Sequence, residues 1–354
     1  MAAKYEILAA QLRRLCTRMK RRGETKLPSE TELAAQTGNS RQTIRHALRM
    51  LEEEGLIRRV RGSGTYLSDE KGKKAARVAV LVSSADTYLY PQLIRDIEAV
   101  CQTEGLQTAV FPTGNEVMKE REVLQSLLKD LPAGILMEAA KSALPSPNLD
   151  LLSAMERQGI PLVFLSAPLP VPGSAPCIRA DNEGGAGMLI RYLLGKGRRR
   201  IGGIFRSDEL QSTERYQGFV SELIRSGCPV DENAILWYDT EDQRHLLREP
   251  DRLPERFDLT RLSGCDALVC CNDEIAYHLI RHLLKAGVRV PEDIAVVSFD
   301  NSHYCLLSPV SITSLTHEKH QPGRAAAEAL LNLINEKSAR SARLSWTLRE
   351  RASG

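Results

Sequence analysis

The feature that most constrains the fold is an alternation, from Arg77 onward, between short apolar runs and amphipathic segments. Runs rich in valine, isoleucine and leucine include "RVAVLVSS", "AGILME", "PLVFLS", "ALVCCND" and "IAVVSFD". Segments with helical spacing, such as "QLIRDIEAVCQTEG" and "ERYQGFVSELIRSG", lie between them. Apolar strands joined by helices predict parallel sheets that are covered on both faces. Because about 280 residues exceed one ordinary core, we expect an α/β body of two Rossmann-like lobes.

The charge is unevenly distributed along the chain. Residues 1–74 hold 17 Lys/Arg against 9 Asp/Glu, a net charge of +8. The remaining residues hold 31 against 36, a net charge of −5, and the two values sum to +3. A basic module on a mildly acidic body predicts that only the first part contacts a polyanion. A solvated basic surface is the alternative.

The basic module has the pattern of a winged helix-turn-helix. A first amphipathic helix is followed by a second, for which Ser29 and Glu32 form a capping box. A turn of two residues, 38–39, leads to a third helix that opens at Ser40 and ends by Gly55. Beyond Gly55 the apolar residues alternate on either side of "RGSG", which predicts a hairpin. We therefore expect a winged-helix DNA-binding domain at residues 1–68 and a linker at 69–76.

The third helix and the hairpin carry the candidate DNA contacts. The N-terminal end of such a helix enters the major groove, where Arg binds guanine, Gln pairs with adenine, and Ser or Thr holds phosphates. The candidates on this helix are Ser40, Arg41, Gln42, Thr43, Arg45 and His46. The hairpin arginines would follow the backbone, and its glycines permit close approach. The hairpin candidates are Arg58, Arg59, Arg61, Gly62, Ser63 and Gly64.

The strings "LPSETELA", "SRQTIRHAL" and "EEEGLIRRVRGSGTYL" resemble the GntR-type winged helix. This resemblance implies that Arg41, Thr43, Arg45 and the glycine-rich tip of the wing contact double-stranded operator DNA. A winged helix that serves only protein contacts is the alternative.

Polar residues follow several of the predicted strands in the body. Ligands bind outside the carboxyl ends of parallel strands, so these positions converge on one site. They are Ser83, Ser84, Glu138, Ser166, Arg206, Asp208, Asn272, Asp273, Asp300 and Asn301. Carboxylates and amides accept from sugar hydroxyls while arginine donates to them, which suits a neutral polyhydroxylated ligand. Tyr88 and Tyr90 could lie against the C–H face of a sugar ring.

The strings "ERYQGF", "CNDEIA", "AGVRVPEDIAVVSFDNS" and "SITSLTH" resemble the LacI/GalR effector domain, a type I periplasmic-binding-protein-like fold. The resemblance implies sugar contacts at Arg215, Asn272, Asp300 and His317, and Asp300–Asn301 stands where that family usually has two aspartates. We expect the body at residues 77–354, with lobes at 77–179 plus 319–340 and 180–318 plus 341–354.

The pairing of a GntR-type head with a LacI-type body resembles the arabinose-operon repressors. That resemblance implies L-arabinose as the effector and a homodimer that releases its operator when the sugar binds. The implied ligand residues are Tyr90, Glu138, Lys141, Asp181, Arg215, Asn272, Asp300 and His317. A different pentose or hexose, or a DNA-binding dimer that does not respond to sugar, are the alternatives.

The sequence favours a regulator over an enzyme. It contains no phosphate-binding loop and no metal triad, so we expect no catalytic residue, cofactor or metal. Its eight cysteines have no CxxC spacing, and no apolar run could span a bilayer, so we expect a cytoplasmic protein with no membrane partner. His278 and His282 are spaced for one metal, but no glutamate lies between them as in HExxH, which favours a partly exposed surface pair.

Overall fold

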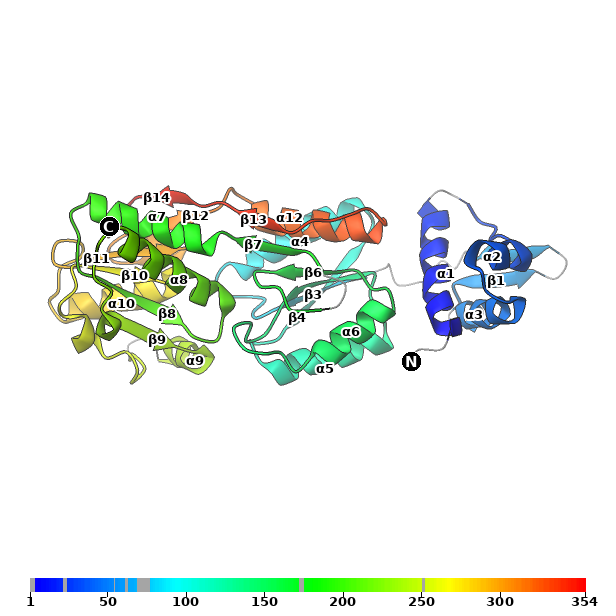
Figure 1. The fold of residues 1–354 in the computed structure, drawn as a ribbon, viewed down its shortest axis with the longest axis horizontal. Coiled ribbons are helices and arrows are strands. Elements are labelled where there is room, and N and C mark those ends of the chain that lie inside the picture. Colours follow the sequence, from blue (N-terminus) through cyan, green and yellow to red (C-terminus); the bar gives the residue numbers. More distant parts are fainter. Residues whose placement is uncertain are drawn as a thin grey trace.

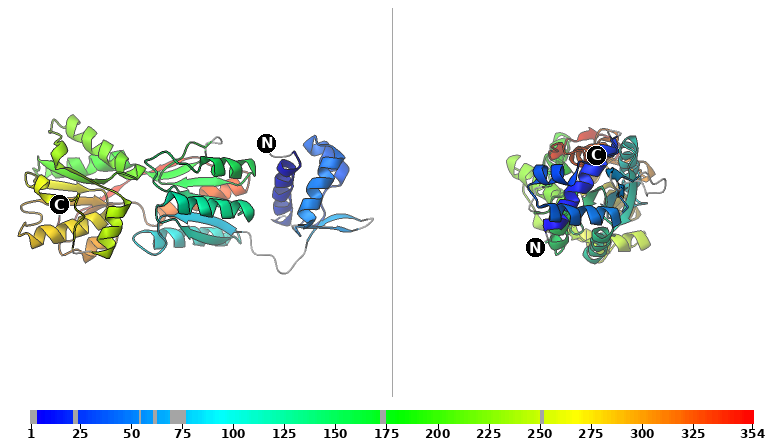
Figure 2. Two further views of the ribbon diagram at one scale, coloured as in Figure 1. Left: turned by 90° about the horizontal axis from the view of Figure 1, so that it is seen from below. Right: turned by 90° about the vertical axis from the view of Figure 1, so that its right-hand side faces the viewer.

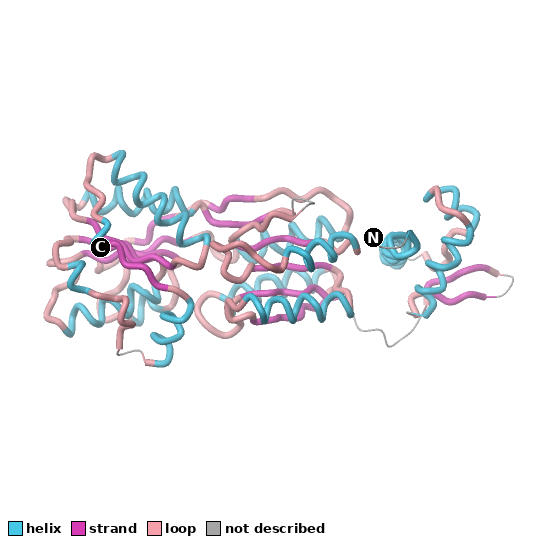
Figure 3. The backbone as a smooth tube through the Cα atoms, turned by 60° about the horizontal axis from the view of Figure 1, so that its bottom comes forward, coloured by secondary structure: helices cyan, strands magenta, loops and turns pink. Residues whose placement is uncertain are grey.

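The computed structural model describes residues 4–21, 24–53, 55–60, 63–68, 77–171, 175–249 and 252–354. The chain forms a small helical head and a larger body of two lobes, each built on a six-stranded sheet (Figure 1). The predicted fold class is confirmed. Helices lie on both sides of the sheets in the views of Figures 2 and 3.

The head is a three-helix unit with a hairpin. Its elements are α1 (Lys4–Arg21), α2 (Glu30–Thr37), α3 (Arg41–Glu53), β1 (Ile57–Val60) and β2 (Gly64–Leu67), with the two strands antiparallel. The predicted capping box is present, because Ser29 and Glu32 each accept from the other's backbone N–H. Gly38 ends α2 in the left-handed conformation that favours glycine. Leu8, Leu12, Ile44 and other apolar side chains close the core between the helices.

The first lobe contains the sheet order β13-β7-β6-β5-β3-β4, and all of its pairings are parallel. Its elements are β3 (Arg77–Val82), α4 (Tyr90–Thr103), β4 (Gln107–Pro112), α5 (Val117–Lys129), β5 (Gly134–Glu138), α6 (Leu149–Arg157), β6 (Leu162–Leu165), β7 (Cys177–Ala180), α12 (Gln321–Ile334) and β13 (Ala342–Leu344). Alternate residues of β3 face opposite cores. Val78 and Val80 pack with α4 and α12, whereas Ala79 and Leu81 pack with α5 and α6.

The second lobe contains the sheet order β14-β12-β11-β10-β8-β9, in which only the β12–β14 pairing is antiparallel. Its elements are α7 (Asn182–Gly195), β8 (Ile201–Arg206), α8 (Leu210–Arg225), the 3-10 turn η1 (Glu232–Ala234), β9 (Ile235–Tyr238), α9 (Thr240–Arg248), the 3-10 turn η2 (Leu259–Leu262), β10 (Ala267–Cys270), α10 (Asp273–Lys285), β11 (Ala295–Phe299), α11 (Tyr304–Leu307), β12 (Thr313–Thr316) and β14 (Thr347–Arg349). Helix α8 packs closely on α7, since a Cβ on Gly218 would meet the backbone of Glu183 at 2.3 Å.

The chain passes between the lobes three times: after β7, after β12 and between β13 and β14. The last crossing differs from our expectation, which gave all of residues 341–354 to the second lobe. Ala342 and Leu344 of β13 pair with Ile178 and Ala180 of β7, so the first lobe extends through residue 344. The sequence did not reveal this because β13 is only three residues long.

The two lobes touch along one side, in a seam between the loop after β4 and helix α9. Asn115, which is buried, donates from its side-chain amide to the Thr240 hydroxyl at 2.8 Å. Arg244 donates to the Gly114 carbonyl at 2.8 Å and to the Glu116 carboxylate at 2.6 Å. The lobes are therefore held together at this side.

None of the helices in the described ranges is both long enough and apolar enough to cross a membrane. All eight cysteines lie in the described ranges, where none of them forms a disulfide, and seven are buried.

Candidate functional site

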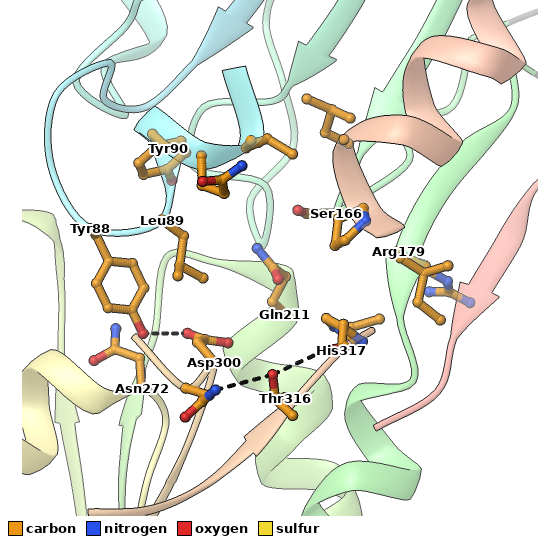
Figure 4. Close-up of a pocket in the computed structure, with 18 of the residues that line it drawn as sticks. Tyr88, Leu89, Tyr90, Ser166, Arg179, Gln211, Asn272, Asp300, Thr316 and His317 are labelled. Carbon is orange, nitrogen blue, oxygen red and sulfur yellow. Dashed lines mark hydrogen bonds between the residues drawn. The ribbon is translucent and has the colours of Figure 1, made fainter. Parts of the chain in front are cut away.

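A cavity of about 860 Å³ lies between the lobes, at the carboxyl ends of both sheets. Of the eight predicted ligand residues, six line it: Tyr90, Glu138, Arg215, Asn272, Asp300 and His317. They come from α4, β5, α8 and the segments after β10, β11 and β12. Figure 4 shows four of them, Tyr90, Asn272, Asp300 and His317. The convergence of strand ends therefore follows the topological rule for open parallel sheets.

Arg215 is the centre of the second-lobe wall. Its guanidinium donates to Asn182 Oδ1 at 3.1 Å, to the Cys271 carbonyl, and to Asp300 Oδ1 at 3.1 Å. The group lies over the Phe299 ring, 4.3 Å from its centroid, in the geometry of a cation–π contact. Because a guanidinium has five N–H groups, two are left for a ligand in the cavity.

Asp300 is shared between the two lobes. The Tyr88 hydroxyl of the first lobe donates to Asp300 Oδ2 at 2.6 Å and accepts from the backbone N–H of Asp273 at 3.3 Å (Figure 4). Burial, followed by the charges of Asp300 and Asp273, raises the pKa of Tyr88 well above its ordinary value, so this hydroxyl stays a donor. Asn272 caps α10 through its side-chain oxygen, which leaves its NH₂ group for the cavity.

The first-lobe wall is built around Glu138. Its carboxylate accepts from the Ser83 backbone N–H at 2.9 Å and from the Tyr90 hydroxyl at 3.2 Å. Burial, and then the charge of Glu209 on the other lobe, raises the pKa of Glu138 to about 7. The two carboxyl groups thus interact across the cavity, and burial also raises the pKa of Glu209.

His317 lies at the crossing after β12. It stacks on Trp346 with ring centroids 3.7 Å apart, and Nδ1 lies 2.9 Å from the Ser345 carbonyl. Burial lowers the pKa of His317, which favours the neutral ring. A neutral ring that donates through Nδ1 has an acceptor at Nε2 for a ligand hydroxyl.

Lys141 and Asp181 are outside the lining of the cavity. Asp181 is the N-cap of α7, where its carboxylate accepts from the Gly184 N–H, and it also lies 3.5 Å from Arg343. Lys141 contributes its backbone N–H to the side-chain oxygen of Asn115 at 2.7 Å, beside the seam. Lys141 and Asp181 therefore do not line the cavity together with the other six predicted residues.

Several lining residues were not among the predicted ligand set. Arg206 is buried and donates to Asp208, Gln243 and Thr240 at 2.6–2.8 Å, and Glu209 lies 2.7 Å from its guanidinium. Arg206 and Asp208 lie at the end of a predicted strand, which is the signal that finds this group. Gln243 belongs to α9, and the sequence has no pattern that places α9 at the cavity.

The head presents its predicted DNA-contacting residues on the surface of α3. Arg41, Gln42 and Arg45 are exposed, and Thr43 is half-buried. Ser40 accepts from the Thr43 backbone N–H at 3.2 Å and so caps the helix. Positive side chains and hydroxyls thus share the N-terminal end of one helix, where a major groove would be read.

Two of the α3 candidates also have partners within the head. Arg45 Nε donates to Glu30 at 2.8 Å, with 64% of the Arg45 side chain exposed. The exposed His46 ring packs on Tyr5 with centroids 4.2 Å apart. With 64% of its side chain exposed, Arg45 stays accessible to a polyanion.

The wing is described in part. Arg58 and Arg59 are exposed on β1, Ser63 bonds to the Tyr66 hydroxyl at 2.6 Å, and Gly64 has φ +124°, which favours glycine. Arg61 and Gly62 lie outside the described residues.

The histidine pair on α10 is not a surface pair. His278 is buried and His282 is half-buried, with the His282 Nδ1 atom 2.8 Å from the His278 carbonyl. Within the described ranges, no group of three or more His, Cys, Asp or Glu side chains has the arrangement that could hold a metal ion.

The cavity offers carboxylates, an amide, a guanidinium and aromatic faces, with the carboxylates and the guanidinium largely engaged with each other. A neutral molecule with many hydroxyl groups satisfies such a set, because each hydroxyl both donates and accepts. A ligand held between the two walls would add bonds across the cavity and favour the closed lobes.

Comparisons with known proteins identify two family models in the chain. The model for bacterial regulatory proteins of the gntR family matches residues 4–67, and a periplasmic binding protein-like domain matches residues 190–354. The arabinose metabolism transcriptional repressor of Geobacillus stearothermophilus is 31% identical over 318 residues, covering 89% of this chain and 86% of that protein. The protein of the same name from Halalkalibacterium halodurans is 30% identical, with 88% and 84% covered.

A solved structure has the same body fold. It is a periplasmic binding protein/LacI transcriptional regulator from Alkaliphilus metalliredigens, complexed with D-xylulofuranose, with a TM-score of 0.68 and 22% identity. The match covers 79% of this chain and 99% of the chain in that structure.

Proposed function

This chain belongs to the family of arabinose metabolism transcriptional repressors, and on that premise we propose that L-arabinose in the interlobe cavity releases it from operator DNA. The family membership makes it a sugar-responsive, DNA-binding transcriptional repressor. The observation that carries the effector assignment is the wall of Arg215, Asp300 and Asn272 facing Glu138 and Tyr90 in one cavity. We place its action in the cytoplasm, where operator DNA lies.

The head supports operator recognition by α3 and the wing. Arg41 and Arg45 are exposed at the N-terminal part of α3, and Arg58 is exposed on β1. Helix and wing would contact base edges and the phosphate backbone respectively. Because phosphate contacts release counterions, operator affinity would fall as the salt concentration rises.

A homodimer would place two heads on a pseudo-palindromic operator. Leu306 and Leu307 at the end of α11 have relative exposures of 74% and 65%, which is unusual for neighbouring leucines. Burial of such a pair against a second copy would remove apolar surface from water.

Effector binding would act through the population of closed lobes. A sugar that contacts both walls binds the closed arrangement of the lobes more tightly than the open one. The affinity of the head for operator DNA can shift only by this difference in sugar affinity. Typical coupling between two sites is about 1–3 kcal/mol, which is a change of roughly 5- to 150-fold in operator affinity.

Isothermal titration of the full chain with L-arabinose tests the proposal, with D-xylose and D-galactose as controls. We expect selective binding of L-arabinose, and weaker operator binding in its presence. Selective binding of another sugar would keep the mechanism and change the effector. A DNA-binding dimer that binds none of these sugars would contradict the proposal.

A further inference from the structure

The seam between the lobes lies at the edge of the body opposite the chain crossings. The crossings follow β7, β12 and β13, strands that lie at or next to one edge of their sheets. The seam joins the loop after β4 to helix α9, which follows β9, and β4 and β9 form the opposite edges of the two sheets. Hinge motions turn about the segments that connect two lobes. The seam is therefore the place where the gap between the lobes widens most when they turn about the crossings.

Five residues form the hydrogen bonds of the seam: Gly114, Asn115 and Glu116 of the first lobe, and Thr240 and Arg244 of the second. Asn115 donates to the Thr240 hydroxyl at 2.8 Å. Arg244 donates to the Gly114 carbonyl at 2.8 Å and to the Glu116 carboxylate at 2.6 Å. None of the five lines the cavity. The seam therefore joins the lobes without offering a contact to a molecule in the cavity.

The first-lobe side of the seam is held in place by its own backbone. Gly114 and Asn115 have φ +63° and +57°, the left-handed conformation that glycine and asparagine adopt more readily than other residues. The Asn115 side-chain oxygen accepts from the Lys141 backbone N–H at 2.7 Å, so its NH₂ group is the end that donates across the seam. Asn115 and Thr240 are both buried. Opening of the lobes would break this bond, so the bond favours the closed arrangement.

The second-lobe side of the seam is connected to the wall of the cavity. The Thr240 hydroxyl accepts from Asn115 and from Arg206, each at 2.8 Å, and donates to Asp208. A hydroxyl has one hydrogen to donate and two lone pairs, so this group is fully used. Arg206 itself lines the cavity. A network of hydrogen bonds therefore runs from the seam to the second-lobe wall.

Arg244 and Lys119 provide a comparison within the same site. Both donate to the same carboxylate oxygen of Glu116, Arg244 at 2.6 Å and Lys119 at 2.9 Å. Lys119 belongs to α5, so its bond to Glu116 stays within the first lobe, whereas Arg244 belongs to α9 of the second lobe. Removal of either side chain takes one cation from Glu116. Only the removal of Arg244 also takes away a bond between the lobes.

We propose that the seam is a clasp that sets the equilibrium between open and closed lobes, and with it the effector concentration at which the operator is released. This inference rests on the proposed function, in which the effector binds the closed lobes, and it assigns the regulation of that response to residues outside the cavity. The apparent affinity of a ligand falls with the fraction of molecules in the arrangement that binds it. A weaker clasp therefore weakens effector binding although every contact to the effector is retained.

Calorimetric titration of the full chain with L-arabinose tests the proposal. We expect Arg244→Ala to weaken binding about fivefold and to raise the sugar concentration for half-maximal operator release by the same factor. Lys119→Ala is the matched control and should stay within about twofold of the parent, as should Arg244→Ala/Glu116→Ala relative to Arg244→Ala, because the bond across the seam is already lost. Unchanged binding by Arg244→Ala, an equal loss in Lys119→Ala, or multiplied losses in the double variant would overturn the clasp.

The outcomes separate this inference from the proposed function. Binding of L-arabinose by the parent and Arg244→Ala alike overturns the clasp and leaves the proposed function in place. Binding of D-xylose or D-galactose in place of L-arabinose refutes the proposed effector, and the same ratios measured with that sugar then decide the clasp. If no sugar binds, the proposed function fails, and hydrogen exchange of the sugar-free protein decides the clasp. Arg244→Ala should then speed exchange in residues 113–117 and 239–244 together, and unchanged exchange in either segment would overturn it.

Discussion

Replacement of Arg215 by lysine should separate effector binding from the fold of the second lobe. Arg215 donates to three acceptors in different directions, on Asn182, Cys271 and Asp300. A lysine ammonium keeps a positive charge for Asp300, but one nitrogen on a flexible stem cannot reach all three acceptors. It also lacks the two further N–H groups of the Arg215 guanidinium, a group that lines the cavity.

The magnitude follows from these two N–H groups. A hydrogen bond that involves a charged group contributes about 1.5–3 kcal/mol, so two bonds to effector hydroxyls contribute roughly 3–6 kcal/mol. At about 1.4 kcal/mol for each factor of ten, Arg215→Lys should weaken effector binding by roughly 100- to 10,000-fold. Arg215→Ala should also destabilise the lobe by about 3–5 kcal/mol, because it leaves the buried carboxylate of Asp300 without its cation.

The assay compares the parent and the variants by calorimetry with L-arabinose, by operator binding, and by thermal unfolding. Arg225→Lys is the matched control, since Arg225 is on the same helix with its side chain 66% exposed. We expect Arg215→Lys to bind operator as the parent does and to stay bound when sugar is added. Release of Arg215→Lys from the operator at the parent's sugar concentration would refute the role of this guanidinium.

Three further predictions address the head and the cavity. Arg45→Ala should weaken operator affinity roughly tenfold with sugar binding retained, and an unchanged affinity would remove Arg45 from the interface. Ser29→Ala, which removes the capping box of α2, should cost about 1 kcal/mol in the urea unfolding of the head, and no loss would mean that water replaces the cap. Burial and Glu209 raise the pKa of Glu138 from 4.5 to about 7, so its ionised form destabilises the fold above pH 7 and the penalty fades as the pH falls toward 4.5. Glu138→Gln should therefore raise the Tm at pH 8 and change it little at pH 4.5, and a larger gain at the acidic pH would contradict this assignment.

The architecture was predictable because each of its determinants is local. The capping box at Ser29, the stop at Gly38 and the change of period after Gly55 are sequence signals for the head. The apolar runs that form β3, β5, β8, β10 and β11 are buried on both faces. Their sequences therefore lack the alternation of apolar and polar residues that is typical of a strand with one exposed face.

The short edge strands were not predictable in the same way. β13 and β14 have three residues each and mixed polarity, so their pairing depends on sheets that were formed by distant parts of the chain. The sequence pattern does not predict β9, "ILWY", because its four residues follow a polar turn.

The cavity was predicted where strand ends carry polar side chains, and missed where helix α9 of the second lobe contributes a side chain. Asp300, Asn272 and Glu138 lie at or within two residues of strand ends, so topology alone brings them together. Asp181 also follows a strand, but the N–H groups at the start of α7 bind its carboxylate. Gln243 enters from α9, whose place depends on packing that no local pattern encodes.

The pairing of β13 with β7 and of β14 with β12 has a consequence for biosynthesis. Ala342 pairs with Ile178, and Leu348 pairs with Leu315. Each sheet therefore lacks one edge strand until this late part of the chain has left the ribosome. Because nascent domains generally fold as units, the first lobe cannot complete ahead of the second even though most of it is translated earlier. Both lobes are closed off by the same short stretch of polypeptide, at nearly the same moment of translation. A stalled or shortened nascent chain would thus have two unfinished sheets with open edges, and the effector cavity would form only after this stretch is made.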